Sequence, residues 1–151
     1  MSAQVSPGES QPKVARSYLV AALLSLVGLA DALYLTVQHL TGQSLRCTIV
    51  AGCSEVLGSA YAHIGPVPLA ALGALAYFTV FSLAILAAFG YRRAGPLLAG
   101  LVAIMFLVTI WLLYLQAFVI HHFCQYCLLS AAVTTSVTAI VWGSMIMKRR
   151  S

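Results

Sequence analysis

The chain has 151 residues, of which 62% are hydrophobic and only 7% are charged, and its mean hydropathy is +0.98. A water-soluble domain of this length has roughly a quarter of its residues charged, so the composition excludes a soluble globule. The net charge of +5 does not indicate nucleic-acid binding, because the basic residues are not clustered. Nearly all of them lie just outside apolar stretches, which is typical of membrane proteins.

Residues 1–15 are polar and contain Ser, Gln, Pro and Gly, which predicts a disordered cytoplasmic tail. Four apolar segments follow at about 18–40, 67–89, 96–120 and 125–147, and each is long enough to cross a bilayer as a helix. Pro66 and Pro68 mark the start of the second helix. We therefore expect an all-α integral membrane protein, a four-helix bundle that occupies residues 16–150 as one domain.

The basic residues predict how this bundle is oriented. Two precede the first segment, two lie in the 90–96 linker (GYRRAGP) and three follow the fourth segment. The 41–66 loop carries only Arg46, and the 121–124 turn carries none. The positive-inside rule therefore predicts a multi-pass protein of the inner (cytoplasmic) membrane, with both termini in the cytoplasm.

The first segment has a competing interpretation, because Ala30-Asp31-Ala32 resembles the cleavage site of a signal peptide. The apolar character continues through Val37, which favours an uncleaved span. Asp31 then lies inside a membrane helix, where ionisable side chains are costly and often functional. Its expected place near the outer surface, or in a hydrogen bond, favours a structural role.

The chain has four cysteines, Cys47, Cys53, Cys124 and Cys127, and the predicted topology places all of them on the outer face. Disulfides persist on that oxidising side. A Cys-x-x-Cys bridge closes too short a loop to stabilise the fold much, whereas its second thiol resolves mixed disulfides. The start of a helix also favours a thiolate. The 124–127 pair is therefore predicted to be redox-active, with a structural disulfide as the alternative.

Zinc binding is a further alternative, with His121 or His122 replacing one cysteine. Five residues separate Cys47 from Cys53, however, and zinc knuckles usually have two to four. In a turn between two spans, the histidines are expected to meet water and lipid headgroups. The sequence therefore predicts no metal site.

Three stretches together resemble the vitamin K epoxide reductase family, and in particular its bacterial disulfide-forming branch. They are Cys47-TIVAG-Cys53-SEVLG-Ser59, GPVPLAALGALAY (65–77) and Cys124-Gln-Tyr-Cys127-LLSA, and the resemblance covers most of residues 18–147. It implies a four-helix bundle around a quinone (ubiquinone or menaquinone), with a short surface helix at 54–61. Cys124–Cys127 would be the active-site disulfide, with Cys127 at the quinone and Cys124 exchanging with the loop.

The resemblance also implies that Cys47 and Cys53 shuttle electrons and that Ser59 lies near the quinone. Gln116, two turns before Cys124, is a candidate hydrogen-bond donor to a quinone carbonyl, or a bridge between helices. We expect no fused thioredoxin-like domain, so the expected thiol partner is a separate extracytoplasmic thioredoxin-like protein. Ala131 stands where vertebrate epoxide-reducing members have a tyrosine, which weakens an epoxide-reducing role.

The expected function is therefore a membrane thiol-disulfide oxidoreductase that reoxidises this partner and passes the electrons to the quinone, supporting disulfide-bond formation. Two alternatives stay open. Quinone or epoxide reduction as the physiological purpose would use the same residues. A non-enzymatic membrane protein with structural disulfides would need none of them for electron transfer.

Overall fold

The computed structural model describes residues 11–41, 63–64, 67–121 and 125–150 of the chain. Its long helices are α1 (Gln11–Thr41), α3 (Leu69–Ala88), α4 (Ala94–Tyr114) and α5 (Gln125–Arg150). The helix α4 continues into η2 (Leu115–Ile120), a π-helical segment. Four helices are long and apolar enough to cross a membrane, which confirms the expected all-α bundle with four spans.

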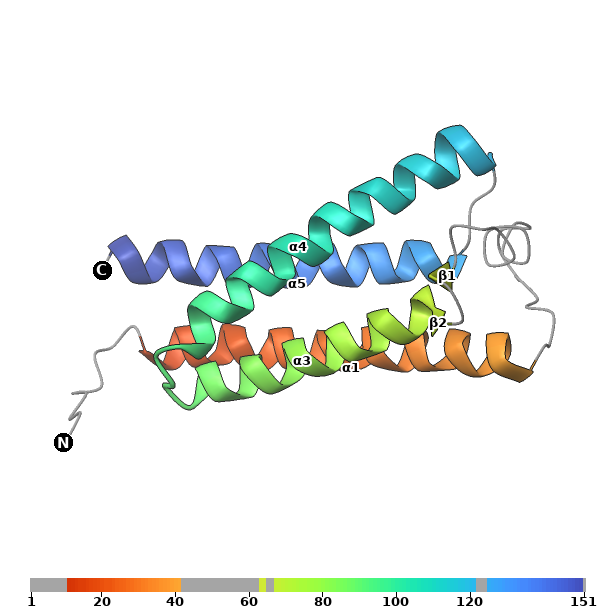
Figure 1. The fold of residues 1–151 in the computed structure, drawn as a ribbon. Coiled ribbons are helices and arrows are strands. Elements are labelled where there is room, and N and C mark those ends of the chain that lie inside the picture. Colours follow the sequence, from red (N-terminus) through yellow and green to blue (C-terminus); the bar gives the residue numbers. More distant parts are fainter. Residues whose placement is uncertain (1–10, 42–62, 65–66, 122–124, 151) are drawn as a thin grey trace.

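The helices run alternately up and down (Figure 1). The helix α1 packs against α3 and α5, and α4 packs against the same two helices from another side. Figure 1 shows that α1 begins and α5 ends at one end of the bundle, next to the 89–93 turn. At the opposite end α1 ends, α3 begins and α5 begins; this end is called the Cys127 end below.

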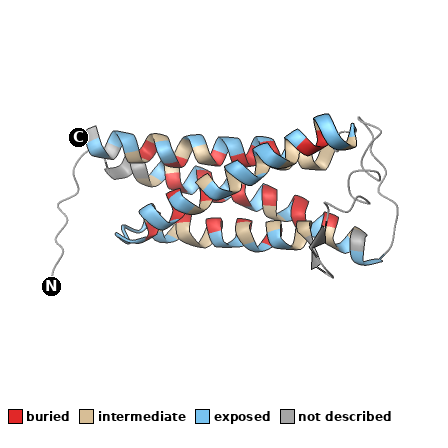
Figure 2. Ribbon diagram, turned by 45° about the horizontal axis from the view of Figure 1, so that its top comes forward, coloured by how far each residue is buried: buried red, intermediate tan, exposed pale blue. Residues whose placement is uncertain are grey.

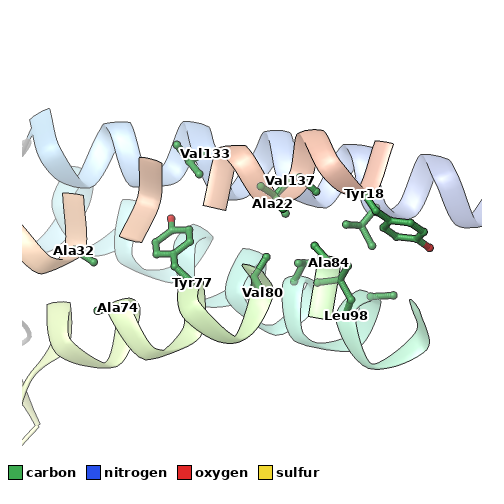
Figure 3. Close-up of a cluster of buried hydrophobic side chains, with 14 residues drawn as sticks. Tyr18, Ala22, Ala32, Ala74, Tyr77, Val80, Ala84, Leu98, Val133 and Val137 are labelled. Atoms are coloured by element: carbon green, nitrogen blue, oxygen red, sulfur yellow. The ribbon is translucent and has the colours of Figure 1, made fainter. Parts of the chain in front are cut away.

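Small residues form much of the buried interior, which lets the helices approach closely. The core cluster spans all four helices, and Figure 3 shows its members between the ribbons. Its tightest positions include Ala21, Ala84, Leu98 and Val141, none of which is exposed to solvent. The opposite faces carry large apolar side chains that stay exposed, as the outward-facing positions in Figure 2 show. In water such faces would aggregate, whereas lipid solvates them.

The helix α3 ends sharply because of the backbone conformation of the turn that joins it to α4. Gly90 has a φ of +90°, a conformation that favours glycine. The amide of Tyr91 donates to the Leu86 carbonyl at 3.0 Å, and the amide of Gly90 donates to the Ala87 carbonyl at 3.0 Å. This pair of bonds is a Schellman motif, which satisfies the last carbonyls of α3.

The observed boundaries differ from the expected ones at three places. Residues 11–15 belong to α1 and not to the expected tail, because the chain is already helical at Gln11. Val67 and Pro68 form the strand β2 (Val67–Pro68), which pairs antiparallel with β1 (His63–Ile64), so the second span begins only at Leu69. The third span ends in a π-helix that the apolar pattern does not reveal. Residues 1–10 and the surface helix expected at 54–61 lie outside the described residues.

Candidate functional site

Cys127 is the third residue of α5 and is partly buried. The first amides of a helix have no partner within it and point along a dipole whose positive end lies there. A thiolate in this first turn is stabilised by both effects. The structure therefore places Cys127 where the sequence predicted, at the start of a membrane-spanning helix. The other three cysteines, Cys47, Cys53 and Cys124, and also Ser59, lie outside the described residues.

Gln116 lies at the Cys127 end, in the π-helical segment η2, and its side chain is only 3% exposed. A buried amide in an apolar bundle needs hydrogen-bond partners. Short π-helical segments within α-helices often occur at functional sites. The segment ends at His121, which is exposed and has a left-handed backbone with φ 61°. Gln116 is thus a buried polar group in an irregular helix end.

An aromatic contact holds the first turn of α5 against α1. The rings of Tyr34 on α1 and Tyr126 on α5 have centroids 5.5 Å apart and planes inclined at 44°. Tilted aromatic pairs at this separation attract beyond the area that they bury. Since Tyr126 directly precedes Cys127, the contact positions the cysteine's backbone relative to α1.

Tyr77 connects α3 to the same part of α5. Its hydroxyl donates to the Ser130 carbonyl at 3.0 Å and shares hydrogen bonds with the hydroxyls of Ser130 at 2.7 Å and Thr134 at 2.8 Å. The Tyr77 side chain is 3% exposed, and Figure 3 shows it reaching inward from α3. Ser130 follows Cys127 by three residues, about 4.5 Å along the helix axis. The beginning of α5 therefore contacts two neighbouring helices, α1 and α3.

Gly28 on α1 makes room for the Tyr77 ring. A Cβ atom at position 28 would lie 2.5 Å from Cζ and 2.7 Å from Cδ1 of Tyr77, closer than real Cβ contacts. The absence of a side chain at Gly28 is what lets the ring lie flat against α1. Three helices thus meet at Tyr77: α1 through Gly28, α3 through Tyr77 itself, and α5 through Ser130 and Thr134.

Asp31 lies one helical turn beyond Gly28 along α1 and is only 8% exposed. Its Oδ2 atom has no hydrogen-bond partner among the residues that the structure describes. Asp31 shares a face of α1 with Gly28, so it lies on the side of α1 that contacts the Tyr77 ring. The structural role that the sequence favoured for Asp31, near the outer surface or in a hydrogen bond, stays a prediction.

Sequence reasoning did not find the group formed by Tyr77, Ser130 and Thr134. A signal was present, because Ser130 and Thr134 stand four residues apart on one face of a helix. A lone tyrosine also interrupts the small-residue pattern of the second span. Neither feature says which helix faces which, so the pairing needed the three-dimensional arrangement.

Comparison with known families gives one match. Residues 19–142 match the vitamin K epoxide reductase family. The matched range begins in α1 and ends in α5, so it includes the second and third spans entirely, most of the first and fourth, and every predicted site residue. Proteins of this family are membrane oxidoreductases that act on thiols, disulfides and quinones.

Proposed function

Because the chain belongs to the vitamin K epoxide reductase family, we propose that it oxidises a separate extracytoplasmic thioredoxin-like protein and passes the electrons to a membrane quinone. The physiological result is disulfide-bond formation outside the cytoplasm. The observation that carries this proposal is the position of Cys127. It lies partly buried in the first turn of a helix that is long and apolar enough to cross a membrane.

The residues at the Cys127 end fit a quinone. Its ring is apolar and dissolves in lipid, and its two carbonyl oxygens accept hydrogen bonds. Cys127 is partly buried, and Gln116 offers a buried amide at the same end of the bundle. These two residues, together with Ser59, are proposed to hold the quinone, which when bound accepts two electrons and two protons.

The relay proposed for the cysteines has two exchanges. A reduced thioredoxin-like protein attacks the Cys47–Cys53 disulfide, leaves oxidised and leaves two thiols in the loop. The loop thiols then reduce Cys124–Cys127, with Cys53 attacking Cys124, and each exchange passes through a mixed disulfide. Electrons collected in water thereby reach a cysteine at membrane depth.

The attachment of the 42–62 loop supports this relay. The helix α1 ends at Thr41 and the chain resumes at His63, both at the Cys127 end of the bundle (Figure 1). In the sequence, Cys47 and Cys53 stand between these two described ends, which suits the proposed exchange with the 124–127 pair. Ala131, one turn after Cys127, is buried and offers no hydroxyl group, which favours disulfide exchange over epoxide reduction.

The proposed location is the inner membrane, with both termini in the cytoplasm and the cysteines outside. Arg92 and Arg93 are exposed in the turn at the end where α1 begins and α5 ends. The sequence places seven of the eight basic residues in the segments at that end, and the positive-inside rule keeps such segments in the cytoplasm.

Trapping of mixed disulfides tests the order of the relay. When the reduced thioredoxin-like partner lacks its second active-site thiol, it should stay covalently attached to Cys47, because the thiol that would resolve the mixed disulfide is missing. In a Cys47→Ala variant, Cys53 should instead accumulate in a bridge to Cys124. The two bridges are distinguished by mass spectrometry of non-reduced peptides. Attachment of the partner to Cys124 or Cys127 would contradict the proposed order.

A further inference from the structure

The buried carboxyl group of Asp31 is used nowhere in the relay described above. Asp31 is the one acidic residue within the four spans, since the other two of the chain are Glu9 and Glu55. None of the apolar stretches 17–38, 69–88, 94–120 and 125–147 contains a lysine or arginine. A charged partner from the spans is therefore excluded, and an ionised carboxylate at this place is costly.

Two contacts between helices bracket Asp31 along α1. Gly28 lies one turn before it, against the Tyr77 ring, and Tyr34 lies about one turn after it, against Tyr126. Since residues three apart share a helix face, Asp31 faces the same region of α3 and α5 as these two neighbours. That region is the beginning of α5, which contains Cys127.

A chain of hydroxyl groups extends from Tyr77 into this turn. The Tyr77 hydroxyl lies 2.7 Å from the Ser130 hydroxyl, and the Tyr77 ring packs against Gly28, one turn before Asp31 on α1. Ser130 and Cys127 are three residues apart on α5, so their side chains are neighbours on one face. Hydroxyl groups both donate and accept hydrogen bonds, so such a chain is able to pass a proton in either direction.

We infer that Asp31 exchanges a proton with the redox centre at Cys127 through the hydroxyl groups of Tyr77 and Ser130. The inference rests on the proposed function. When the Cys124–Cys127 dithiol is oxidised, one S–S bond forms, two S–H bonds break, and two electrons and two protons leave. A quinone that becomes a quinol accepts both electrons and both protons. Asp31 takes up the proton of one S–H bond and releases one to the quinol, so its own state is unchanged over a turnover.

Of the groups in this region, Asp31 is the one that holds the exchangeable proton. In the described part of the chain, the titratable residues at the contacts that bracket Asp31 are Tyr77 on α3, Tyr34 on α1 and Tyr126 on α5, and Cys127 follows Tyr126. The apolar stretch of α4 and η2 contains no charged residue. Asp31 acts through the hydroxyl chain, so it is a positioning residue.

The first test separates the two half-reactions of the purified protein. Asp31→Asn keeps the shape of the side chain but removes the exchangeable proton. The rate at which a soluble quinone oxidises the pre-reduced variant, measured by rapid mixing, should fall at least about tenfold. Reduction of its cysteines by dithiothreitol should keep the wild-type rate. Asp31→Glu should restore quinone reduction, and Ser25→Ala, a buried polar change on the same helix, should alter neither rate.

A second readout needs no quinone. The infrared difference spectrum between the reduced and oxidised protein should contain a carboxyl C=O band that shifts in ²H₂O. The band should be absent from Asp31→Asn and present in Ser25→Ala. Three results would each overturn the inference. They are a wild-type spectrum without this band, an Asp31→Asn variant that reduces quinone at the wild-type rate, and an Asp31→Asn variant that is slowed equally in both half-reactions. Failure of the wild-type protein to reduce quinone would instead overturn the proposed function.

Discussion

The hydroxyl group of Tyr77 on α3 lies 2.7 Å from the hydroxyl group of Ser130 on α5 and 3.0 Å from its carbonyl oxygen. Ser130 is one helical turn from Cys127, so the bond joins the second span to the turn that carries the cysteine. Interhelical hydrogen bonds in membranes usually contribute about 1 kcal/mol each or less, because the separated helices find other partners. The hydrogen bond between Tyr77 and Ser130 also fixes the position of the beginning of α5 relative to α3.

Removal of the Tyr77 hydroxyl should destabilise the bundle moderately. A Tyr77→Phe variant loses its bonds to Ser130 and Thr134 but keeps the ring against Gly28, so we expect a loss of about 1 kcal/mol. Unfolding of the purified protein in mixed micelles by a denaturing detergent measures this loss. Tyr91→Phe, at an exposed position of the α3–α4 turn, is the control and should be neutral. Equal stability of the two variants would show that the hydrogen bonds contribute nothing.

Substitution of Gly28 by alanine should destabilise the bundle far more than the small size of the added methyl group suggests. The Cβ of Gly28→Ala would meet Cε1, Cζ and Cδ1 of the Tyr77 ring at 2.7 Å or less, so the ring and its hydrogen bonds must shift. Overpacking of this kind costs about 1–3 kcal/mol. Gly100→Ala on α4 meets no atom within 4 Å and should be neutral or slightly stabilising, because alanine favours helix. The same unfolding measurement compares the two, and an unaffected Gly28→Ala would contradict the observed fit.

The contact between Tyr34 and Tyr126 should appear as an energetic coupling. In a double-mutant cycle of Tyr34→Ala and Tyr126→Ala, we expect a coupling of about 0.5–1.5 kcal/mol, since aromatic pairs at this distance attract each other. The ring pair of Tyr114 and Phe118, 5.1 Å apart and exposed, provides a comparison within one helix end. Strict additivity of the Tyr34 and Tyr126 effects would mean that the contact does not hold α5 against α1.

The proposed orientation predicts which helix ends meet the outside. Two exposed positions at opposite ends of the bundle, Thr41 and Tyr91, are suited to cysteine labelling in a variant without the four native cysteines. A membrane-impermeant maleimide added to intact cells should label Thr41→Cys and leave Tyr91→Cys unlabelled until the cells are opened. The reverse pattern would place the native cysteines on the cytoplasmic side.

The fold was predictable from the sequence because membrane spans are specified by composition and length. The four apolar stretches and the basic residues beside them required no tertiary information, and the helices formed where they were expected. Helix ends were less predictable. Pro68 fits the first turn of a helix in the sequence, but it lies in a short strand, and the π-helix around Gln116 leaves the apolar pattern unchanged.

The site was predictable only in part. Cys127 could be placed at a helix start because the spacing of Cys-x-x-Cys and the onset of an apolar run are both local signals. The grouping of Gly28, Asp31 and Tyr77 with Ser130 depends on which faces of three helices meet. The hydrophobic pattern could not reveal these faces, because the spans are apolar on all sides and lipid accepts any of them.

The most direct test of the central claim is quinone reduction by the purified protein with a reduced thioredoxin-like protein as the electron donor. The wild-type protein should convert quinone to quinol as thiols disappear in a one-to-one ratio of dithiol to quinol. Cys127→Ala should abolish quinol formation. Ser136→Ala on the same helix, whose hydroxyl bonds only to its own helix at the Ala132 carbonyl, should retain it. Quinol formation by Cys127→Ala at the wild-type rate would contradict the account.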